Sequence, residues 1–407
     1  VQTCALPISP TSAPTQHGLD AAADRALLAL GFLAGDVGAA AGSNSWAVDG
    51  RRSAHGGALL ADDMHLGLRV PNTWYRAALS WTDEGGAARR LDGVTLPGVP
   101  AVVAGSNGRV AWGFTNSYAD VQDLVVLEPA PGRPDAYLAP GGPRALERHA
   151  EVLRVRGGAD EPLDVLDSAW GPVVDADHEG RRRALLWTAR LPGAVDLGLL
   201  ALERAATLDE ALDAAARSGI PPQNFLCADA AGRIGWTIAG RLPRRVGFDG
   251  RLPASFADGA RRWEGLRPPE ETPRLADPPG GRLWTANARV ADGEALALLG
   301  DGGYALGARA GQIEERLRAR EAFSERDLLA IQLDDRALFL RRWQGLLLRQ
   351  LTLEAMTADP RLVEVRKAVK DWGGHAAVGS VGYRLVRAWR LAVLERLLSP
   401  LLEGPRR

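Results

Sequence analysis

The sequence predicts an α+β fold, in which a long strand-rich region precedes a helical one. From residue 46 onward, short apolar runs are separated by Gly, Pro and Asn, which is typical of strands and turns. From residue 308 the apolar spacing becomes helical. The run GDGGYALG, at residues 300–307, does not lead from a strand into a helix as a dinucleotide-binding loop does. This order of elements favours α+β over a doubly wound sheet.

The first 42 residues differ in character from the remainder of the chain, and we expect them to be a spacer. Residues 10–42 contain a polar Pro/Ser/Thr piece, an Ala/Leu-rich piece at 21–33 that fits one helix, and a tail of small residues. Residues 1–9 lack the basic region and the apolar stretch of a signal peptide, and they fit poorly with the residues after them. We expect residues 1–9 to be artefactual and assign them no function.

Strands are predicted in several segments of the region after the spacer. The segments with strand-like apolar runs bounded by turns are 58–68, 73–81, 93–129, 183–191 and 232–243. Helix is predicted over 195–219, where TLDEALDAAARSG resembles a capped helix ending at Gly219. Further helices are predicted from Ala308 to the end of the chain.

Composition narrows the class of partner. The chain has 407 residues, 46% of them hydrophobic, which is enough for a large core or two lobes. Its net charge of −1 gives no overall field for nucleic acid or an anionic membrane, so we expect neither as a partner and favour a neutral or amphipathic small molecule. Two cysteines are too few for a disulfide framework, and they lack metal-site spacing.

A short stretch before the first strand, AAAGSNSWAVDG at residues 39–50, suggests a nucleophile. A serine hydroxyl needs a base to attack a carbonyl. Cleavage between Gly42 and Ser43 would give Ser43 a free α-amine, whose ordinary pKa is about 7.7–8.0. That amine can take the hydroxyl proton, through one water, and return it to the leaving amine. The alternative is an ordinary Gly-Ser turn before a strand.

Six motifs follow one another in an order that resembles a known family. They are GSNSWAV, LLADDMHL, PGVPAVVAGSNGRVAWGFTN, DVQD, PQNFLCADAAGRIGWTIAGRLPRR and WTANARV. This order is similar to that of the penicillin amidase family, N-terminal-nucleophile (Ntn) hydrolases that include penicillin, cephalosporin and acyl-homoserine-lactone acylases. The resemblance implies an αββα sandwich of two antiparallel sheets, with a helical C-terminal region. It also implies that residues 43–407 are a large-subunit domain truncated at its C-terminus, without the small subunit that precedes the spacer.

The resemblance also implies a set of site residues. His65, 22 residues after Ser43, would orient the serine hydroxyl or polarise the α-amine; the alternative is a core histidine. The backbone N–H of Asn116 and the side-chain amide of Asn224 would stabilise the oxyanion, although asparagines also serve as turn residues. Arg245 would hold the site and support Asn224, with the register uncertain between it and Arg244, and the alternative is an exposed arginine pair.

A structural calcium is implied at the DVQD motif. Asp120 and Asp123 would bind it together with the Gln122 carbonyl and ligands from elsewhere, including the missing small subunit, because calcium prefers oxygen ligands. Two carboxylates three residues apart are also commonly just solvated. No organic cofactor is expected, since no Cys/His cluster, phosphate loop or G-x-S-x-G motif occurs.

Together these observations predict an acylase that hydrolyses the amide bond of an N-acyl small molecule through an acyl-enzyme, after self-cleavage at Ser43. The resemblance implies a periplasmic or secreted protein, partnered by a small subunit from the same precursor. Two alternatives stay open. The chain is a non-catalytic binding relative, or it is an inactive fragment that lacks its small subunit.

Overall fold

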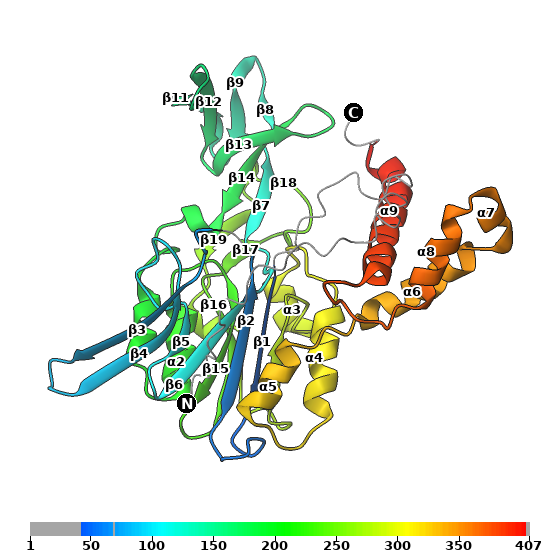
Figure 1. Ribbon diagram of the computed structural model, residues 1–407. Coiled ribbons are helices and arrows are strands. Elements are labelled where there is room, and N and C mark those ends of the chain that lie inside the picture. Colours follow the sequence, from blue (N-terminus) through cyan, green and yellow to red (C-terminus); the bar gives the residue numbers. More distant parts are fainter. Residues whose placement is uncertain (1–41, 68–69, 404–407) are drawn as a thin grey trace. The chain divides into compact units, whose positions relative to one another are not determined.

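The computed structural model describes residues 42–67 and 70–403 (Figure 1). The predicted spacer before Gly42, with its helix at 21–33, lies outside the described residues. Within the described part, the chain forms two compact units, residues 42–325 and residues 326–403.

Two antiparallel sheets face each other in the first unit. The smaller has the strand order β2-β1-β21, formed by Leu59–His65, Gly42–Val48 and Arg282–Thr285. The larger has the order β20-β16-β15-β6-β5-β4-β3, and its strands are, in that order, Arg274–Ala276, Ile234–Ala239, Gln223–Asp229, Val110–Asn116, Ala104–Ser106, Ala88–Thr95 and Tyr75–Thr82. Strands β1 and β2 pack on β6 and β15, so the two sheets form the inner layers of a sandwich.

Helices cover the outer faces of these sheets. Helix α2 (Leu208–Arg217) and the 3₁₀ turn η2 (Gly198–Glu203) lie on β15 and β16, over a core that includes Leu208, Leu212 and Phe225. On the other side, α4 (Ala308–Arg318) packs against β1 and β21. This is the predicted αββα arrangement, in which strand β1 carries Ser43 between the larger sheet and α4.

The predicted helix over 195–219 is broken into two pieces. Thr207 caps α2, because its side chain accepts a hydrogen bond from the Glu210 N–H, while the Glu210 carboxylate accepts one from the Ala206 N–H. This reciprocal cap fixes the helix start at Leu208 and leaves the residues before it in η2. The helix ends at Arg217, two residues before the predicted end.

A further sheet of the first unit was only partly predicted. Its order is β11-β12-β13-β14-β7-β18, with strands Glu147–Leu153, Glu161–Ser168, Gly171–Ala176, Arg182–Trp187, Gln122–Val126 and Ala254–Ser255. The sequence predicted β7 and β14, which have buried apolar residues. Strand β11 is exposed along its whole length, so its sequence lacks the apolar alternation from which a strand is predicted.

Short elements complete the first unit. They are β8 (Pro129–Ala130), β9 (Arg133–Ala139), β10 (Gly142–Ala145), β17 (Pro243–Val246), β19 (Arg262–Leu266), η1 (Thr188–Arg190), η3 (Pro269–Glu271) and α3 (Gly293–Leu299). Strand β17 pairs with β19, and this pair carries Arg245 opposite Trp263.

The second unit is helical, as the apolar period predicted. After α5 (Glu325–Gln332), which spans the unit boundary, come η4 (Leu338–Leu340), α6 (Arg341–Gln350), α7 (Leu353–Ala358), α8 (Arg361–Lys370) and α9 (Val381–Glu403). Its core includes Leu347, Val369 and Val386. Among the described helices, α9 included, none combines the length and the apolar character that a membrane span requires.

Candidate active site

Two N–H groups converge on the hydroxyl of Ser43, the second residue of β1. The backbone N–H of Asn116, at the end of β6, lies 3.3 Å from Ser43 Oγ. The side-chain amide of Asn287 donates to the same oxygen at 3.1 Å. Paired donors of this kind stabilise the negative oxygen that develops in acyl transfer. The two groups therefore lie where they can donate to negative charge that develops beside the Ser43 hydroxyl.

Asn287 follows β21 and is held by contacts at both ends of its amide. Its Nδ2 donates to Ser43 Oγ and, at 3.0 Å, to the Asn116 carbonyl. Its Oδ1 accepts from the Ser43 N–H at 2.8 Å and from Arg309 Nη2 at 2.8 Å. Only this orientation of the amide satisfies all four bonds. The residue has φ +64°, in the left-handed region that asparagine tolerates better than most residues.

Arg309, in the first turn of α4, connects the elements around the nucleophile. Its Nη1 donates to the Ser43 carbonyl at 2.9 Å and to Asn44 Oδ1 at 2.5 Å, while Nη2 holds Asn287. Burial lowers the pKa of the Arg309 guanidinium, and nearby Asp63 opposes this change. The guanidinium thus fixes both the backbone of Ser43 and the amide of Asn287.

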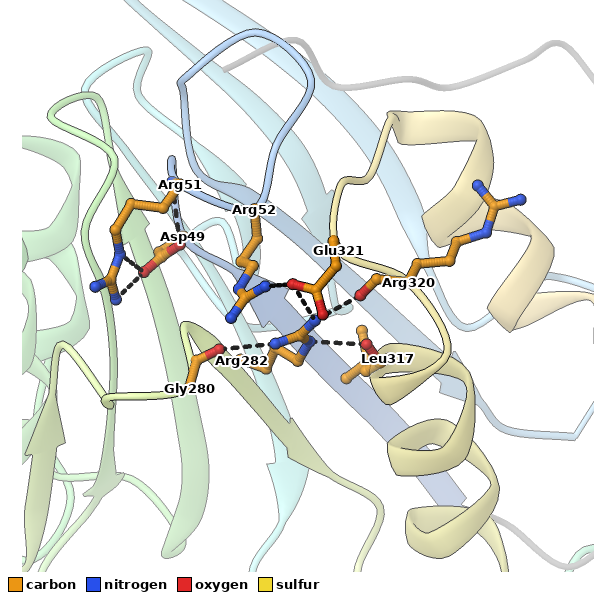
Figure 2. Close-up of polar contacts among 8 residues, drawn as sticks. All are labelled: Asp49, Arg51, Arg52, Gly280, Arg282, Leu317, Arg320 and Glu321. Atoms are coloured by element: carbon orange, nitrogen blue, oxygen red, sulfur yellow. Dashed lines mark hydrogen bonds and ion pairs between the residues drawn. The ribbon is translucent and has the colours of Figure 1, made fainter.

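A second arginine, Arg282 at the start of β21, fastens the far end of α4 (Figure 2). It donates to the carbonyls of Leu317 at 2.7 Å and Arg320 at 2.5 Å, which belong to the end of α4 and the turn after it, and its Nη1 donates to the Gly280 carbonyl at 3.0 Å. A guanidinium at a helix C-terminus also complements the helix dipole. Strand β21 and helix α4 are therefore joined at one end by Arg282 and at the other by the Asn287–Arg309 contact.

Gly42, on the other side of the Ser43 peptide bond, is closely surrounded by polar groups. A Cβ at this position would lie 2.7 Å from His65 Nε2, 3.1 Å from Arg309 Nη2 and 3.2 Å from Asn287 Oδ1. His65 is paired with Gly42 across β1 and β2, and its Nδ1 lies 3.1 Å from the Asp63 carbonyl. The predicted histidine thus lies beside the bond expected to be cut.

The structure does not bring the Asn224 amide to Ser43. Asn224 is fully buried; its Nδ2 donates to Thr115 Oγ1 at 3.1 Å, and its Oδ1 accepts from Trp236 Nε1 at 3.0 Å. The register explains the difference, because Asn224 pairs with Thr115, one residue before Asn116, and Thr115 in turn donates to Thr285 between the sheets. The amide on Ser43 is that of Asn287, in the motif WTANARV, for whose asparagine no role was predicted.

Arg245 also lies elsewhere than predicted. Its hydrogen bonds go to Asp123 Oδ2 at 2.8 Å and to the Asp120 carbonyl at 3.1 Å, and it forms an ion pair with Asp120 Oδ1 at 3.0 Å. It therefore binds two of the residues predicted for calcium instead of supporting Asn224. Gln122 begins β7, opposite Trp187. The arginine that does support the site, Arg309, had no signal of its own in an arginine-rich sequence.

One more ionisable group lies close to the site, two residue pairs along the sheet from Ser43. Asp62 in β2 pairs with Ser45 in β1, and Ser45 pairs with Thr285 in β21. Neither carboxyl oxygen of Asp62 is exposed or hydrogen-bonded. Burial raises the pKa of Asp62 to about 8, and the Ser45 hydroxyl and Phe114 N–H, which lie near without forming a hydrogen bond, offset this rise only in part. The carboxyl group is thus largely neutral at pH 7.

Three comparisons with known proteins point to the same family. A family model described as penicillin amidase matches residues 6–407. The penicillin acylase 2 proenzyme of Pseudomonas sp. strain SE83 is 34% identical over 387 residues, 93% of this chain and 48% of that protein. The acyl-homoserine lactone acylase QuiP of Pseudomonas aeruginosa is 30% identical over 348 residues, 82% of this chain and 39% of that protein.

A solved structure, thermostable penicillin G acylase from Alcaligenes faecalis, matches with a TM-score of 0.64 at 25% identity, over 82% of this chain and 59% of that one. The chain therefore spans about half the length, or less, of the two curated Pseudomonas relatives. The match extends over nearly the whole of this sequence, and the predicted fold is confirmed. On this ground the chain belongs to the penicillin amidase family.

Proposed function

We propose that the chain carries the catalytic centre of an acylase that hydrolyses the amide bond of an N-acyl small molecule. The observation that carries the proposal is the convergence of the Asn116 N–H and the Asn287 amide on Ser43 Oγ. The names of the relatives support the substrate class, since one is a penicillin acylase and another an acyl-homoserine lactone acylase. Both substrates contain an acyl group bound to nitrogen.

The nucleophile is Ser43 after its peptide bond to Gly42 has been cut. In the first reaction, Ser43 Oγ attacks the Gly42 carbonyl and forms an ester bond to it. The C–N bond breaks, and the proton lost by the hydroxyl passes to the nitrogen, which becomes the free α-amine. Water then hydrolyses the resulting ester and releases the upstream segment. The name proenzyme, given to the Pseudomonas sp. relative, supports maturation by cleavage.

In turnover, the same oxygen attacks the substrate carbonyl. The α-amine accepts the hydroxyl proton through one water, and the tetrahedral oxyanion is held by the Asn116 N–H and the Asn287 amide. The C–N bond of the substrate breaks, and the proton passes to the leaving amine. Water then attacks the acyl-enzyme by the same route and releases the acid.

The remaining polar residues hold this machinery in place. Asn287 Oδ1 lies 2.8 Å from the Ser43 nitrogen, so this oxygen orients the α-amine. The Nδ2 of the same amide is the proposed oxyanion donor. Arg309 donates to Asn287 Oδ1 and to the Ser43 carbonyl, so it holds the Asn287 side chain and the Ser43 backbone in fixed positions relative to each other. His65, beside Gly42, orients the groups at the bond to be cut.

Mass spectrometry of the expressed protein tests the proposal. A new N-terminus at Ser43 is expected, together with hydrolysis of penicillins or N-acyl-homoserine lactones in a substrate panel. The variant Ser43→Ala should show neither cleavage nor turnover, while Ser45→Ala, two residues further along the same strand, should show both. Turnover by a chain whose Gly42–Ser43 bond is intact would refute the proposed base.

Two further parts of the proposal concern the setting of the enzyme. We expect a small subunit from the same precursor to complete the substrate pocket, and co-expression with that segment should raise activity. We expect the mature protein in the periplasm or outside the cell, which fractionation of the producing cells would test.

A further inference from the structure

A buried group of charges lies where the motif DVQD suggested a calcium site. Arg245, on β17, places its guanidinium against both carboxylates of the motif, with Nη2 3.0 Å from Asp120 Oδ1 and Nε 2.8 Å from Asp123 Oδ2. The side chains of Arg245, Asp120 and Asp123 are 10%, 13% and 3% exposed. All three charges are therefore shielded from bulk water.

The guanidinium already uses the oxygens that a metal ion would need. Besides the two carboxylates, Arg245 Nη2 donates to the Asp120 carbonyl at 3.1 Å. Trp263, opposite Arg245 on β19, donates its indole N–H to Asp123 Oδ2 at 2.5 Å, and its ring lies 5.7 Å from the guanidinium carbon. The indole thus contacts both partners of the ion pair and holds them together.

The described residues leave a calcium ion too few ligands. Calcium takes about 6–8 oxygens, and residues 42–67 and 70–403 contain no cluster of three or more His, Cys, Asp or Glu side chains fit to bind a metal. A Cβ on Gly250 would lie 2.6 Å from Arg245 Nε and 2.8 Å from Asp120 Oδ2, so backbone closes this side of the group. One acceptor is left over, Asp123 Oδ1, which is buried without a hydrogen bond.

We propose that Arg245 is the resident cation of this site and takes the place of a bound metal. The residues present fit an internal guanidinium–dicarboxylate group, and they do not fit calcium. The group fastens the connection between β6 and β7 to β17, and β6 carries the Asn116 N–H at its end. Two buried carboxylates in one short segment need a nearby positive charge, because unpaired buried charges are strongly destabilising.

The wild-type protein gives the first arm of the test. Thermal unfolding should have the same Tm in EDTA and in millimolar calcium, and elemental analysis of purified protein should find no stoichiometric metal. A Tm that falls in EDTA, or one calcium per chain after gel filtration, would overturn the proposal. Neither measurement depends on activity, so the proposal stands or falls separately from the proposed function.

Variants give the second arm. Arg245→Gln should lower Tm by about 5–15 °C, the range expected when one partner of a buried charge pair is removed. Added calcium or terbium should then raise the Tm of this variant more than that of the wild type, because the two carboxylates have lost their cation. Arg244→Gln is the matched control, since Arg244 forms only a partly exposed pair with Glu271, and it should change Tm little.

If Arg245→Gln does not fold, Arg245→Lys replaces it. The lysine keeps the charge but reaches only one carboxylate at a time, so an intermediate Tm is expected. Equal stability of wild type and Arg245→Gln in EDTA would contradict the proposal.

Discussion

Replacing Asp62 by asparagine should make the protein more stable at neutral pH, which is unusual for a substitution so close to an active site. Burial raises the pKa of this carboxyl from 3.8 to about 8 in the folded protein. The unfolded chain releases the proton near pH 4, whereas the folded chain keeps it until about pH 8. The contribution of Asp62 to stability is therefore complete below pH 4 and is lost as the pH rises towards 8.

The size of this loss follows from the two pKa values. Between pH 3.8 and pH 7, ionisation of Asp62 in the unfolded chain lowers the free energy of unfolding by about 1.36 kcal/mol per pH unit. The upper limit of this loss is about 4 kcal/mol at pH 7. Asparagine has nearly the same shape and carries no charge at any pH, so Asp62→Asn removes the loss. The asparagine amide buries polar atoms as the neutral acid does, and any difference in this burial cost reduces the gain. We therefore expect the free energy of unfolding at pH 7 to rise by about 1–4 kcal/mol.

The assay is equilibrium unfolding in urea at a series of pH values from 4 to 9. The difference between Asp62→Asn and wild type should be small at pH 4, grow with pH, and level off above pH 8. A gain that is independent of pH, or a variant less stable than wild type at pH 8, would refute the reasoning. Asp63→Asn is the control, because this neighbouring carboxylate accepts a hydrogen bond from Asn44 and its loss should not stabilise.

Three further predictions concern the candidate active site. Asn287→Ala should lower kcat about 10²–10³-fold in steady-state assays, the usual loss for one oxyanion donor. Gly42→Ala should slow the appearance of the Ser43 terminus on a denaturing gel by about tenfold or more, because overpacking costs about 1–3 kcal/mol and the new Cβ would displace His65. Arg282→Met should lower kcat/KM by up to about 10²-fold through α4. Arg318→Met should have a smaller effect, because this more exposed side chain pairs with Glu314 and joins α4 to β21 only through its contact with the Trp284 ring.

The sequence predicted the elements of the site that lie in strands with clear apolar patterns. Strand β1 with Ser43, β2 with His65 and β6 with Asn116 all have buried residues, and their motifs are contiguous. The α+β class followed from the change of period near residue 308, which the helices from α4 onward confirm.

The sequence could not rank two asparagines, Asn224 and Asn287, because each lies in a family motif at the start or just after the end of a strand. Only the strand pairing separates them. Asn224 pairs with Thr115 inside the sandwich, while Asn287 leaves β21 in a left-handed conformation beside Ser43. The available signal was an asparagine two residues after the end of a strand that pairs with the strand of Ser43, and it required knowing that β21 pairs with β1.

The contacts of the arginines could not be predicted for a different reason. Arg245 and Arg309 are two of many arginines in this sequence, and each is defined by what it reaches across the fold: Asp120 and Asp123 for the first, Ser43 for the second. The two Asp residues were interpreted as ligands for an external cation because the sequence does not show that β17 brings a cation to them. Long side chains contact partners far away in the chain, so local motifs predict them poorly.

The uncut chain already contains the complete set of contacts around Ser43, and this constrains how the two reactions are related. With Gly42 and Ser43 in one continuous strand, the donors of Asn116 and Asn287 are already on the serine oxygen, and Arg309 already holds its carbonyl. Both donors therefore lie beside the proposed nucleophile before cleavage, and we propose that the same pair serves both acyl transfers. Loss of Asn287 should accordingly slow cleavage as well as turnover. A change at Gly42 should slow cleavage alone, because in the proposed maturation that residue leaves with the upstream segment.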